Sequence, residues 1–228
     1  MKQNVTRQLV LRAVGSFLFR LACYDAMVWM ALLAEVRPIA GRLPDVLLDA
    51  VPYVPVIDKY NYLLWLCSYV PIALWLFFTE GPRFVRYMIS SGLLALIRGV
   101  CIWVTGLPAV TGQDVHANLD PQSRWEAFLH LVTPFGFFDT EAGARVYLTK
   151  DLFFSGHTAT TFLLLLYVWK FPKLRAAMLV THVLVVASVF FAHLHYTIDV
   201  IGAYAITLAL FVLREGRVGV FSESPSGP

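Results

Sequence analysis

The chain has 228 residues, of which 58% are hydrophobic and 14% are charged, and its formal net charge is +3. Its mean hydropathy is +0.67. This composition excludes an intrinsically disordered chain and is unusual for a soluble domain. The small positive charge gives no reason to expect nucleic-acid binding.

Six apolar segments approach the roughly 20 residues that a helix needs to cross a bilayer. The first is the weakest, because it contains Arg20 and Asp25. The six segments are residues 14–34, 61–79, 84–104, 152–171, 174–193 and 198–213. We therefore predict an all-α, polytopic membrane protein with six transmembrane helices in a bundle. We expect a single membrane domain over residues 1–228 that ends in a flexible tail at 215–228.

The connection between the third and fourth segments, residues 106–150, contains no good span. Within it, the stretch RWEAFLHLV (124–132) has the amphipathic pattern of a helix that lies at the membrane interface. Such a helix could form a lip over a site, or it could be a simple surface anchor. We add this interfacial helix to the predicted bundle.

Basic residues gather in the connections on one side of the predicted membrane. These residues are Lys2, Arg7, Arg12, Arg83, Arg86, Lys170, Lys173, Arg175, Arg214 and Arg217. The long loops of the opposite side hold most of the acids, namely Asp45, Asp49, Asp58, Asp114, Asp120, Glu126, Asp139, Glu141 and Asp151. Because lysine and arginine favour the cytoplasmic side, we expect both termini in the cytoplasm.

Two polar motifs fall on the exoplasmic face in this topology. SGHT (155–158) opens the fourth segment, and HLHYTID (193–199) joins the fifth segment to the sixth. The orientation was deduced from charges that include none of these residues, so their convergence is independent support for one site. We expect His157, His195 and Asp199 to meet there.

The SGHT motif has the residue types of a phosphate site. Ser155 and Thr158 are helix-starting residues, and Gly156 lets a ligand approach the backbone. The N-terminus of a helix offers free N–H groups and a positive dipole end to an anion. We therefore predict that these three residues bind phosphate.

His195 and Asp199 are four residues apart and share a helix face if the sixth helix begins here. The carboxylate can hold one imidazole nitrogen protonated and leave the other free to attack phosphorus. His157 would start protonated, donate to the departing lipid alkoxide, and then act as base on the incoming hydroxyl. The pattern thus predicts phosphoryl transfer through a phosphohistidine-type intermediate.

Structural interpretations compete with this chemistry. His157 could be a structural histidine at the interface, and His195 with Asp199 could be a structural pair that joins two spans. His193, His195 and Asp199 could hold a metal, but residues two apart point to different sides of a helix. The cysteines lie inside apolar segments, which favours small buried side chains over a disulfide framework or a zinc site. They are Cys23, Cys67 and Cys101, and we expect no metal and no cofactor.

The motifs resemble those of a known family. DLFFSGHT (151–158) and HYTIDVIGAY (195–204) resemble the two catalytic motifs of the sphingomyelin synthase family, a branch of the type 2 phosphatidic acid phosphatase superfamily. RLPDVLLDAVP (42–52) resembles its first exoplasmic loop, and RYMISSGLLALIRGVCIWVTGLP (86–108) resembles its third span. The similarity covers a catalytic core of residues 42–213.

The resemblance implies roles for particular residues. His157, His195 and Asp199 would form the catalytic triad. Arg98 stands at the family's intramembrane arginine, where a buried cation is expensive and phosphate is its natural partner. Asp25 is the alternative, structural partner for Arg98.

The chain also departs from the family pattern. Thr149 and Lys150 replace the cysteine and glycine that precede Asp151 in the family, and Lys150 adds a positive charge near the expected phosphate site. Val189 and Met30 stand where the wider phosphatase motifs have an arginine and a lysine. Losing these cationic clamps favours a phosphodiester substrate, which carries less charge than a phosphomonoester.

Headgroup contacts are harder to assign. Asp151, Glu126 and Asp45 could meet a cationic amine headgroup, or they could be solvated loop acids. Four aromatic residues could contact a quaternary ammonium group, although interfacial aromatics are commonly membrane anchors. They are Trp125, Phe137, Tyr147 and Phe153.

The resemblance implies a membrane phospholipid headgroup transferase. It would move phosphocholine or phosphoethanolamine from a glycerophospholipid to ceramide, or to a diacylglycerol-type acceptor, and release diacylglycerol. With water as acceptor the same histidines would make a phospholipase C or a lipid phosphatase. The alternative of a different class is a non-catalytic lipid transporter or scramblase. The compact chain favours a bacterial inner membrane, and an oligomer stays open.

Overall fold

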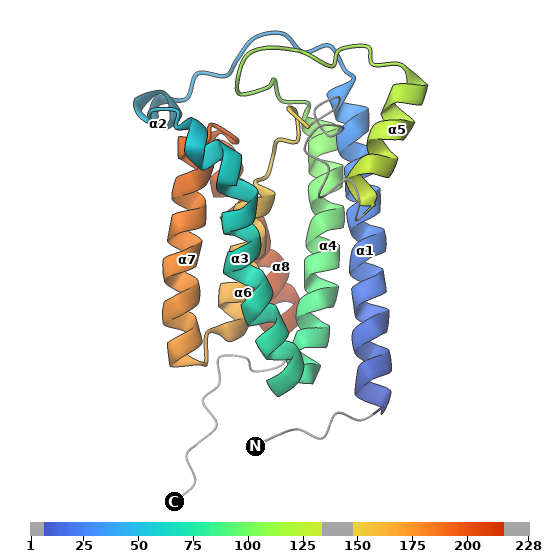
Figure 1. Ribbon diagram of the computed structural model, residues 1–228, viewed down its shortest axis with the longest axis vertical. Helices are drawn as coiled ribbons and strands as arrows, with labels where there is room; N and C mark the ends of the chain where they lie inside the picture. Colours follow the sequence, from blue (N-terminus) through green and yellow to red (C-terminus); the bar gives the residue numbers. More distant parts are fainter. Residues whose placement is uncertain (1–6, 134–147, 217–228) are drawn as a thin grey trace, which may run out of the picture.

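The computed structural model describes residues 7–133 and 148–216 (Figure 1). The sequence predictions that concern Lys2, Phe137, Asp139, Glu141, Tyr147 and the tail beyond residue 216 lie outside these residues. The described residues form eight α-helices and no β-strand, which confirms the all-α prediction. The helices are α1 (Arg7–Glu35), α2 (Val46–Ala50), α3 (Pro55–Thr79), α4 (Gly81–Thr105), α5 (Pro121–Val132), α6 (Gly156–Val168), α7 (Pro172–Phe191) and α8 (Thr197–Glu215).

Five of these helices, α1, α3, α4, α7 and α8, are long and apolar enough to cross a membrane. Each contains or closely matches a predicted apolar segment. The chain is therefore an integral, multi-pass membrane protein. Large apolar side chains that would be anomalous on a soluble surface, such as Leu213 at 77% exposed, face outward from these helices as expected for contact with lipid.

The connections between helices divide between the two ends of the bundle (Figure 1). The start of α1 and the α3–α4 and α6–α7 connections lie at one end. The opposite end carries α2 and the segment 106–120 that precedes α5, and we call it the loop end. This division matches the predicted sorting of short basic connections from long acidic loops.

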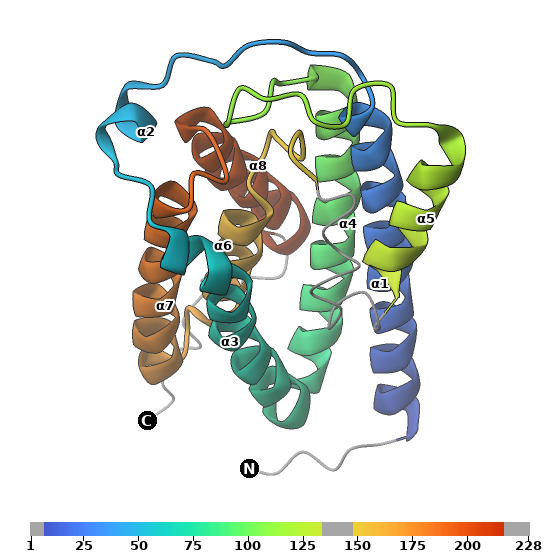
Figure 2. The same cartoon turned by 45° about the horizontal axis from the view of Figure 1, so that its top comes forward.

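The fourth predicted segment, residues 152–171, is only partly helical. Its helix, α6, covers 13 residues, so it is about 20 Å long and shorter than the roughly 30 Å hydrocarbon core. The reason lies at its start, where Ser155 caps the helix and residues 149–155 are not helical, because other elements hold them. As a result α6 begins below the loop end, inside the bundle (Figure 2).

α1 and α4 run side by side, as both views show (Figures 1 and 2). Small residues permit this close approach. A Cβ on Gly99 would lie 2.8 Å from the Cα of Met27, and one on Gly92 would lie 3.1 Å from the Cα of Arg20. Gly92 and Gly99 are seven residues apart, so they present one face of α4 to α1, as small residues commonly do between membrane helices.

The predicted interfacial helix is α5, which lies at the loop end beside α1 (Figure 1). Asp120 caps it by accepting hydrogen bonds from the N–H groups of Gln122 and Ser123, both at 3.0 Å. Its aromatic side packs on α1, where the Trp29 ring lies 6.1 Å from Trp125 and 5.4 Å from Phe128. Trp125 therefore packs against α1, with about half of its surface still exposed.

A buried polar contact joins three helices at the end opposite the loops. The hydroxyl of Tyr167 on α6 donates to Glu215 Oε1 on α8 at 2.7 Å. Arg86 on α4 pairs with the same carboxylate at 3.1 Å. Glu215 is 1% exposed, so the Tyr167 hydroxyl and the charge of Arg86 offset part of the cost of burying its carboxylate. The contact holds the far ends of α4, α6 and α8 together.

Candidate active site

The first turn of α6 forms the centre of the site. Ser155 is fully buried, and its hydroxyl accepts the N–H of Thr158 at 3.4 Å. Gly156 stands directly beside Arg98, because a Cβ at this position would lie 3.2 Å from the guanidinium Cζ and Nε. A larger residue would push the arginine away from the helix start. The predicted phosphate motif thus brings free helix N–H groups and a guanidinium to one place.

Arg98 is 6% exposed and holds the segment before α6. Its Nε donates to the carbonyl of Phe154 at 2.6 Å, and its Nη2 donates to the carbonyl of Asp151 at 3.1 Å. The same Nη2 pairs with the Asp151 carboxylate at 2.8 Å. The partner of Arg98 is therefore Asp151, and the alternative expectation of a pair with Asp25 was wrong.

Asp199 and His195 form a buried pair at the start of α8. Asp199 is fully buried, and its carboxylate accepts from His195 Nδ1 at 3.3 Å and from the N–H groups of Tyr196 and Phe153, both at 3.0 Å. A carboxylate can only accept, so this contact favours the His195 tautomer that carries its proton on Nδ1, with the lone pair on Nε2. The bond from Phe153 also ties the segment before α6 to α8.

The two motif histidines come together. The ring centroids of His157 and His195 are 6.4 Å apart, with 63° between the ring planes. The His157 ring also packs against Trp65 on α3 in a T-shaped arrangement, at 5.2 Å between centroids. The rings of the two motif histidines therefore lie beside each other.

A chain of buried hydrogen bonds supports the backbone of His157. The hydroxyl of Thr161 donates to the His157 carbonyl at 2.9 Å and contacts His182 Nδ1 at 2.8 Å. His182 Nε2 contacts the hydroxyl of Tyr204 at 2.7 Å. Both ring nitrogens of the buried His182 therefore have a hydroxyl partner, one on α6 and one on α8. The only sign of these hydrogen bonds in the sequence was that Thr161 follows His157 by four residues.

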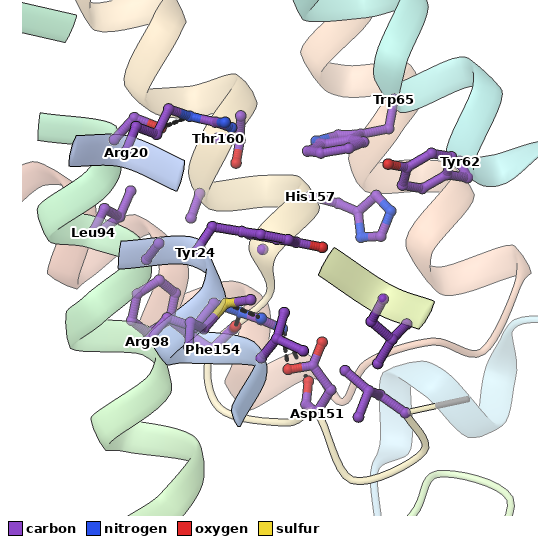
Figure 3. A pocket seen from close by; sticks show the side chains of 18 residues that line it. Arg20, Tyr24, Tyr62, Trp65, Leu94, Arg98, Asp151, Phe154, His157 and Thr160 are labelled. Carbon is purple, nitrogen blue, oxygen red and sulfur yellow. Dashed lines mark hydrogen bonds and ion pairs between the residues drawn. The ribbon is translucent and has the colours of Figure 1, made fainter. Parts of the chain in front are cut away.

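A cavity of about 180 Å³ opens next to this site. His157, Gly156, Arg98 and Asp151 line it, as Figure 3 shows for the labelled side chains. Several further lining residues were not expected from the sequence. They are Arg20, Tyr24, Tyr62, Trp65, Ser91 and Thr160.

The three predicted headgroup acids lie in three different environments. Asp151 lines the cavity but is paired with Arg98. Glu126 is exposed on α5 and accepts from Gln122 Nε2 at 3.0 Å. Asp45 lies outside the cavity wall and accepts from the N–H of Thr197 at 2.6 Å and its hydroxyl at 2.7 Å. The structure brings only Asp151 to the site.

Asp45 acts as a cap for two helices. It accepts the N–H of Leu48 in α2 at 3.1 Å as well as the two bonds from Thr197 in the first turn of α8. Burial raises the pKa of Asp45, but the hydrogen bonds from Thr197 and Leu48 outweigh it and hold the pKa below its ordinary value. The loop that carries Asp45 therefore braces the start of the helix that positions His195.

Lys150 does not face the cavity, contrary to the charge expected near the phosphate site. It is 1% exposed, and its ammonium donates to the carbonyls of Glu35 at 2.9 Å and Arg37 at 2.7 Å. It also forms an ion pair with Asp114. Burial raises the pKa of Asp114, but bonds from Lys150 and the Ile39 N–H hold it below its ordinary value. Lys150 thus anchors the segment that leads into Asp151.

The histidine next to the pair points elsewhere. His193 Nε2 contacts the carbonyl of Val51 at 2.9 Å, and its ring packs against Tyr53. Within residues 7–133 and 148–216, no group of three or more His, Cys, Asp or Glu side chains is arranged to hold a metal ion.

Comparison with known proteins agrees with this geometry. Residues 150–215 match the family model described as PAP2 superfamily C-terminal, which covers both histidine motifs. This part of the chain is thus similar to the C-terminal region of the PAP2 superfamily, and the predicted resemblance is confirmed.

The particular relatives are sphingomyelin synthases. Phosphatidylcholine:ceramide cholinephosphotransferase 1 of Rattus norvegicus is 28% identical over 224 residues, which cover 86% of this chain and 49% of the relative. Phosphatidylcholine:ceramide cholinephosphotransferase 2 of Homo sapiens is 35% identical over 134 residues, which cover 55% of this chain and 36% of the relative. The chain spans about half the length, or less, of these curated relatives.

Proposed function

We propose that this protein transfers a phosphoalcohol headgroup from a glycerophospholipid to ceramide and releases diacylglycerol. The observation that carries the proposal is the His195–Asp199 pair, whose imidazole lies 6.4 Å from that of His157 beside a cavity walled by Arg98. The relatives named as phosphatidylcholine:ceramide cholinephosphotransferases support the same reaction class.

In the first step, His195 Nε2 attacks the phosphorus of the donor lipid. The bond from phosphorus to the diacylglycerol oxygen breaks, and the headgroup phosphate stays on His195 as a phosphohistidine-type intermediate. Asp199 keeps the proton on Nδ1 and stabilises the positive charge that develops on the ring. His157, protonated, gives its proton to the departing alkoxide, which is too basic to leave unassisted.

In the second step, His157 takes the proton from the primary hydroxyl of ceramide. That oxygen attacks phosphorus, the bond to His195 Nε2 breaks, and His195 returns to its neutral form. The N–H groups at the start of α6, with Ser155, Gly156, Thr158 and Arg98, hold the phosphoryl oxygens in both steps. Arg98 acts with Asp151 already at its side, so the pair presents less net charge than a lone guanidinium, which suits a phosphodiester.

The proposal places the loop end, and with it the site, on the exoplasmic face, with both termini in the cytoplasm. It treats residues 1–228 as one membrane domain with a catalytic core at 42–213. Phosphocholine and phosphoethanolamine are both candidate headgroups, and the bacterial inner membrane stays the predicted location. No cofactor or metal enters either step.

The test uses purified protein in lipid nanodiscs that contain phosphatidylcholine and phosphatidylethanolamine, with and without ceramide. Mass spectrometry follows every lipid product, and His195→Ala protein is the blank. A headgroup-bearing ceramide formed in step with diacylglycerol supports the transferase and identifies the headgroup. Diacylglycerol formed equally without ceramide would mean a phospholipase C. If the protein moves lipid between leaflets without forming any product, and His195→Ala protein does the same, the protein is a transporter or scramblase.

A further inference from the structure

The cavity extends well below the phosphate site, along one face of α4. Ser91, Leu94, Ala95 and Arg98 all line it, at spacings that place them on one side of the helix. Ser91 and Arg98 are seven residues apart, which corresponds to about 10 Å along the helix axis. The cavity is therefore a slot that runs from the loop end toward the middle of the membrane.

Arg20 lies at the deep end of this slot. Its Nε donates to the hydroxyl of Ser91 at 3.0 Å. Figure 3 shows Arg20 and Thr160 at one end of the lining side chains and Asp151 at the other, with Tyr24 and His157 between them. Arg20 is thus separated from the phosphate site but open to the same cavity.

The guanidinium of Arg20 has more donors than the helices around it use. A guanidinium carries five N–H groups, and Ser91 accepts one of them. Within residues 7–133 and 148–216, no carboxylate forms an ion pair with Arg20, including Asp25 on the same helix. An arginine in the middle of a membrane helix is expensive and is retained where it binds something.

The surroundings of Arg20 indicate which chemistry it would bind. Leu94, Ala95 and Ala159 are apolar lining residues, while Ser91 and Thr160 add hydroxyls. Asp151, the one carboxylate among the lining residues, is paired with Arg98 at the other end. The deep end therefore offers guanidinium N–H donors in a partly apolar slot that has no carboxylate to pair with them. A carbonyl oxygen, which only accepts hydrogen bonds and is attached to apolar chain, fits this environment.

We propose that Arg20 is a binding residue for an acyl carbonyl oxygen of a lipid substrate, about two helical turns below the phosphate site. This inference rests on the proposed function, because a phosphate at Gly156 and Arg98 places the acyl linkages of the same lipid in the slot beneath it. The carbonyl belongs either to an ester of the glycerophospholipid donor or to the amide of the ceramide acceptor. Both present the same chemistry to the guanidinium.

The experiment removes the carbonyl from the lipid and the guanidinium from the protein separately. The donor is offered as a diacyl phospholipid or as its dialkyl ether analogue, and the acceptor as ceramide or as an N-alkyl sphingoid that lacks the amide carbonyl. Arg20→Met keeps the apolar stem of the side chain, and Arg20→Lys keeps the charge. Arg12→Met, on an exposed position of the same helix away from the cavity, is the matched control.

In nanodiscs, we expect wild-type protein to use the carbonyl-bearing form of one lipid about ten- to hundredfold better in kcat/KM, the range for a hydrogen bond to a charged group. Arg20→Met should lose this preference, with activity falling for the carbonyl-bearing lipid alone. Arg20→Lys should retain part of it, and Arg12→Met all of it. Loss of the ester preference assigns the donor, and loss of the amide preference assigns the acceptor.

Two results would overturn the inference. One is an equal loss of activity by Arg20→Met on all four lipids, which would mean a structural role or a direct contact with phosphate. The other is no loss on any of them. If wild-type protein makes no headgroup-bearing ceramide at all, the proposed function fails instead. Arg20 is then tested by binding alone. His195→Ala protein, with and without Arg20→Met, is offered the same diacyl and dialkyl lipids in competition, and native mass spectrometry measures how much of each lipid it retains.

Discussion

The carboxylate of Asp45 accepts the backbone N–H of Thr197 at 2.6 Å, and this bond joins the loop after α1 to the first turn of α8. The two residues are 152 positions apart in the chain. The contact matters because His195 and Asp199 flank Thr197, so the loop supports the part of α8 that orients the proposed nucleophile. Asp45, which the sequence analysis placed at the headgroup, therefore stabilises the backbone of the site instead.

Asp45→Ala should destabilise the fold, because it removes the cap of α2 and the acceptor for α8 together. The loss of one cap costs about 0.5–2 kcal/mol, and two helices depend on Asp45. Thermal unfolding in detergent measures the change. Asp49→Ala is the matched control, since Asp49 only forms an exposed ion pair with Arg42, which contributes little. Equal unfolding midpoints for the two variants would contradict the bracing role.

His157→Ala should slow the reaction by an amount that depends on the leaving group. With a phospholipid donor we expect a loss on the order of 10²–10⁴-fold, because the alkoxide then leaves without a proton. With p-nitrophenyl phosphocholine, whose leaving group needs no acid, His157→Ala should still release one equivalent of nitrophenolate in a burst. Rapid-mixing absorbance measures this burst, and His195→Ala should abolish it. A His157→Ala protein that shows no burst would refute the division of labour.

Thr161→Val should destabilise the bundle although it conserves shape. The substitution leaves the buried His182 Nδ1 without its hydroxyl partner, which costs about 1–3 kcal/mol. Thr181→Val is the control, because the Thr181 hydroxyl contacts only its own helix, at the carbonyl and sulfur of Met178. Chemical unfolding curves compare the two. Indistinguishable free energies of unfolding would show that the His182 chain contributes nothing.

The ion pair between Lys150 and Asp114 should appear in the pH dependence of stability. The pKa of Asp114 is below its ordinary value in the folded protein, so folding favours its ionised form. Its contribution is fully present above the ordinary value of about 3.9 and is lost as the pH falls through the lower folded pKa. Asp114→Asn should therefore lower the unfolding midpoint at neutral pH and flatten its decline in acid. A decline as steep as that of wild type would contradict the assignment, and Asp49→Asn should behave as wild type.

Much of this fold could be read from local patterns. Five apolar segments coincide with long helices, and the amphipathic stretch at 124–132 lies in α5, because apolar length and periodicity are properties of neighbouring residues. The cap at Ser155 and the contact between His195 and Asp199 could also be predicted from the sequence, since capping and i,i+4 contacts act within one or two helical turns.

The length of α6 could not be predicted from the sequence in the same way. Residues 152–155 are apolar enough to extend the helix, yet Asp199 takes the N–H of Phe153 and Arg98 takes the Phe154 carbonyl. These competing partners come from α8 and α4. The residues next to α6 in the sequence do not indicate that these partners from α8 and α4 are present.

The sequence by itself determined the helical membrane fold, the convergence of the two histidine motifs and the resemblance to the PAP2 superfamily. Only the tertiary structure decided the partners of the buried polar groups: Asp151 for Arg98, Asp114 for Lys150, and Thr197 for Asp45. It also placed Arg20 in the cavity. The physical reason is that apolar length and capping depend on adjacent residues. A buried charge is satisfied by whichever helix or loop packs against it, however distant in the chain.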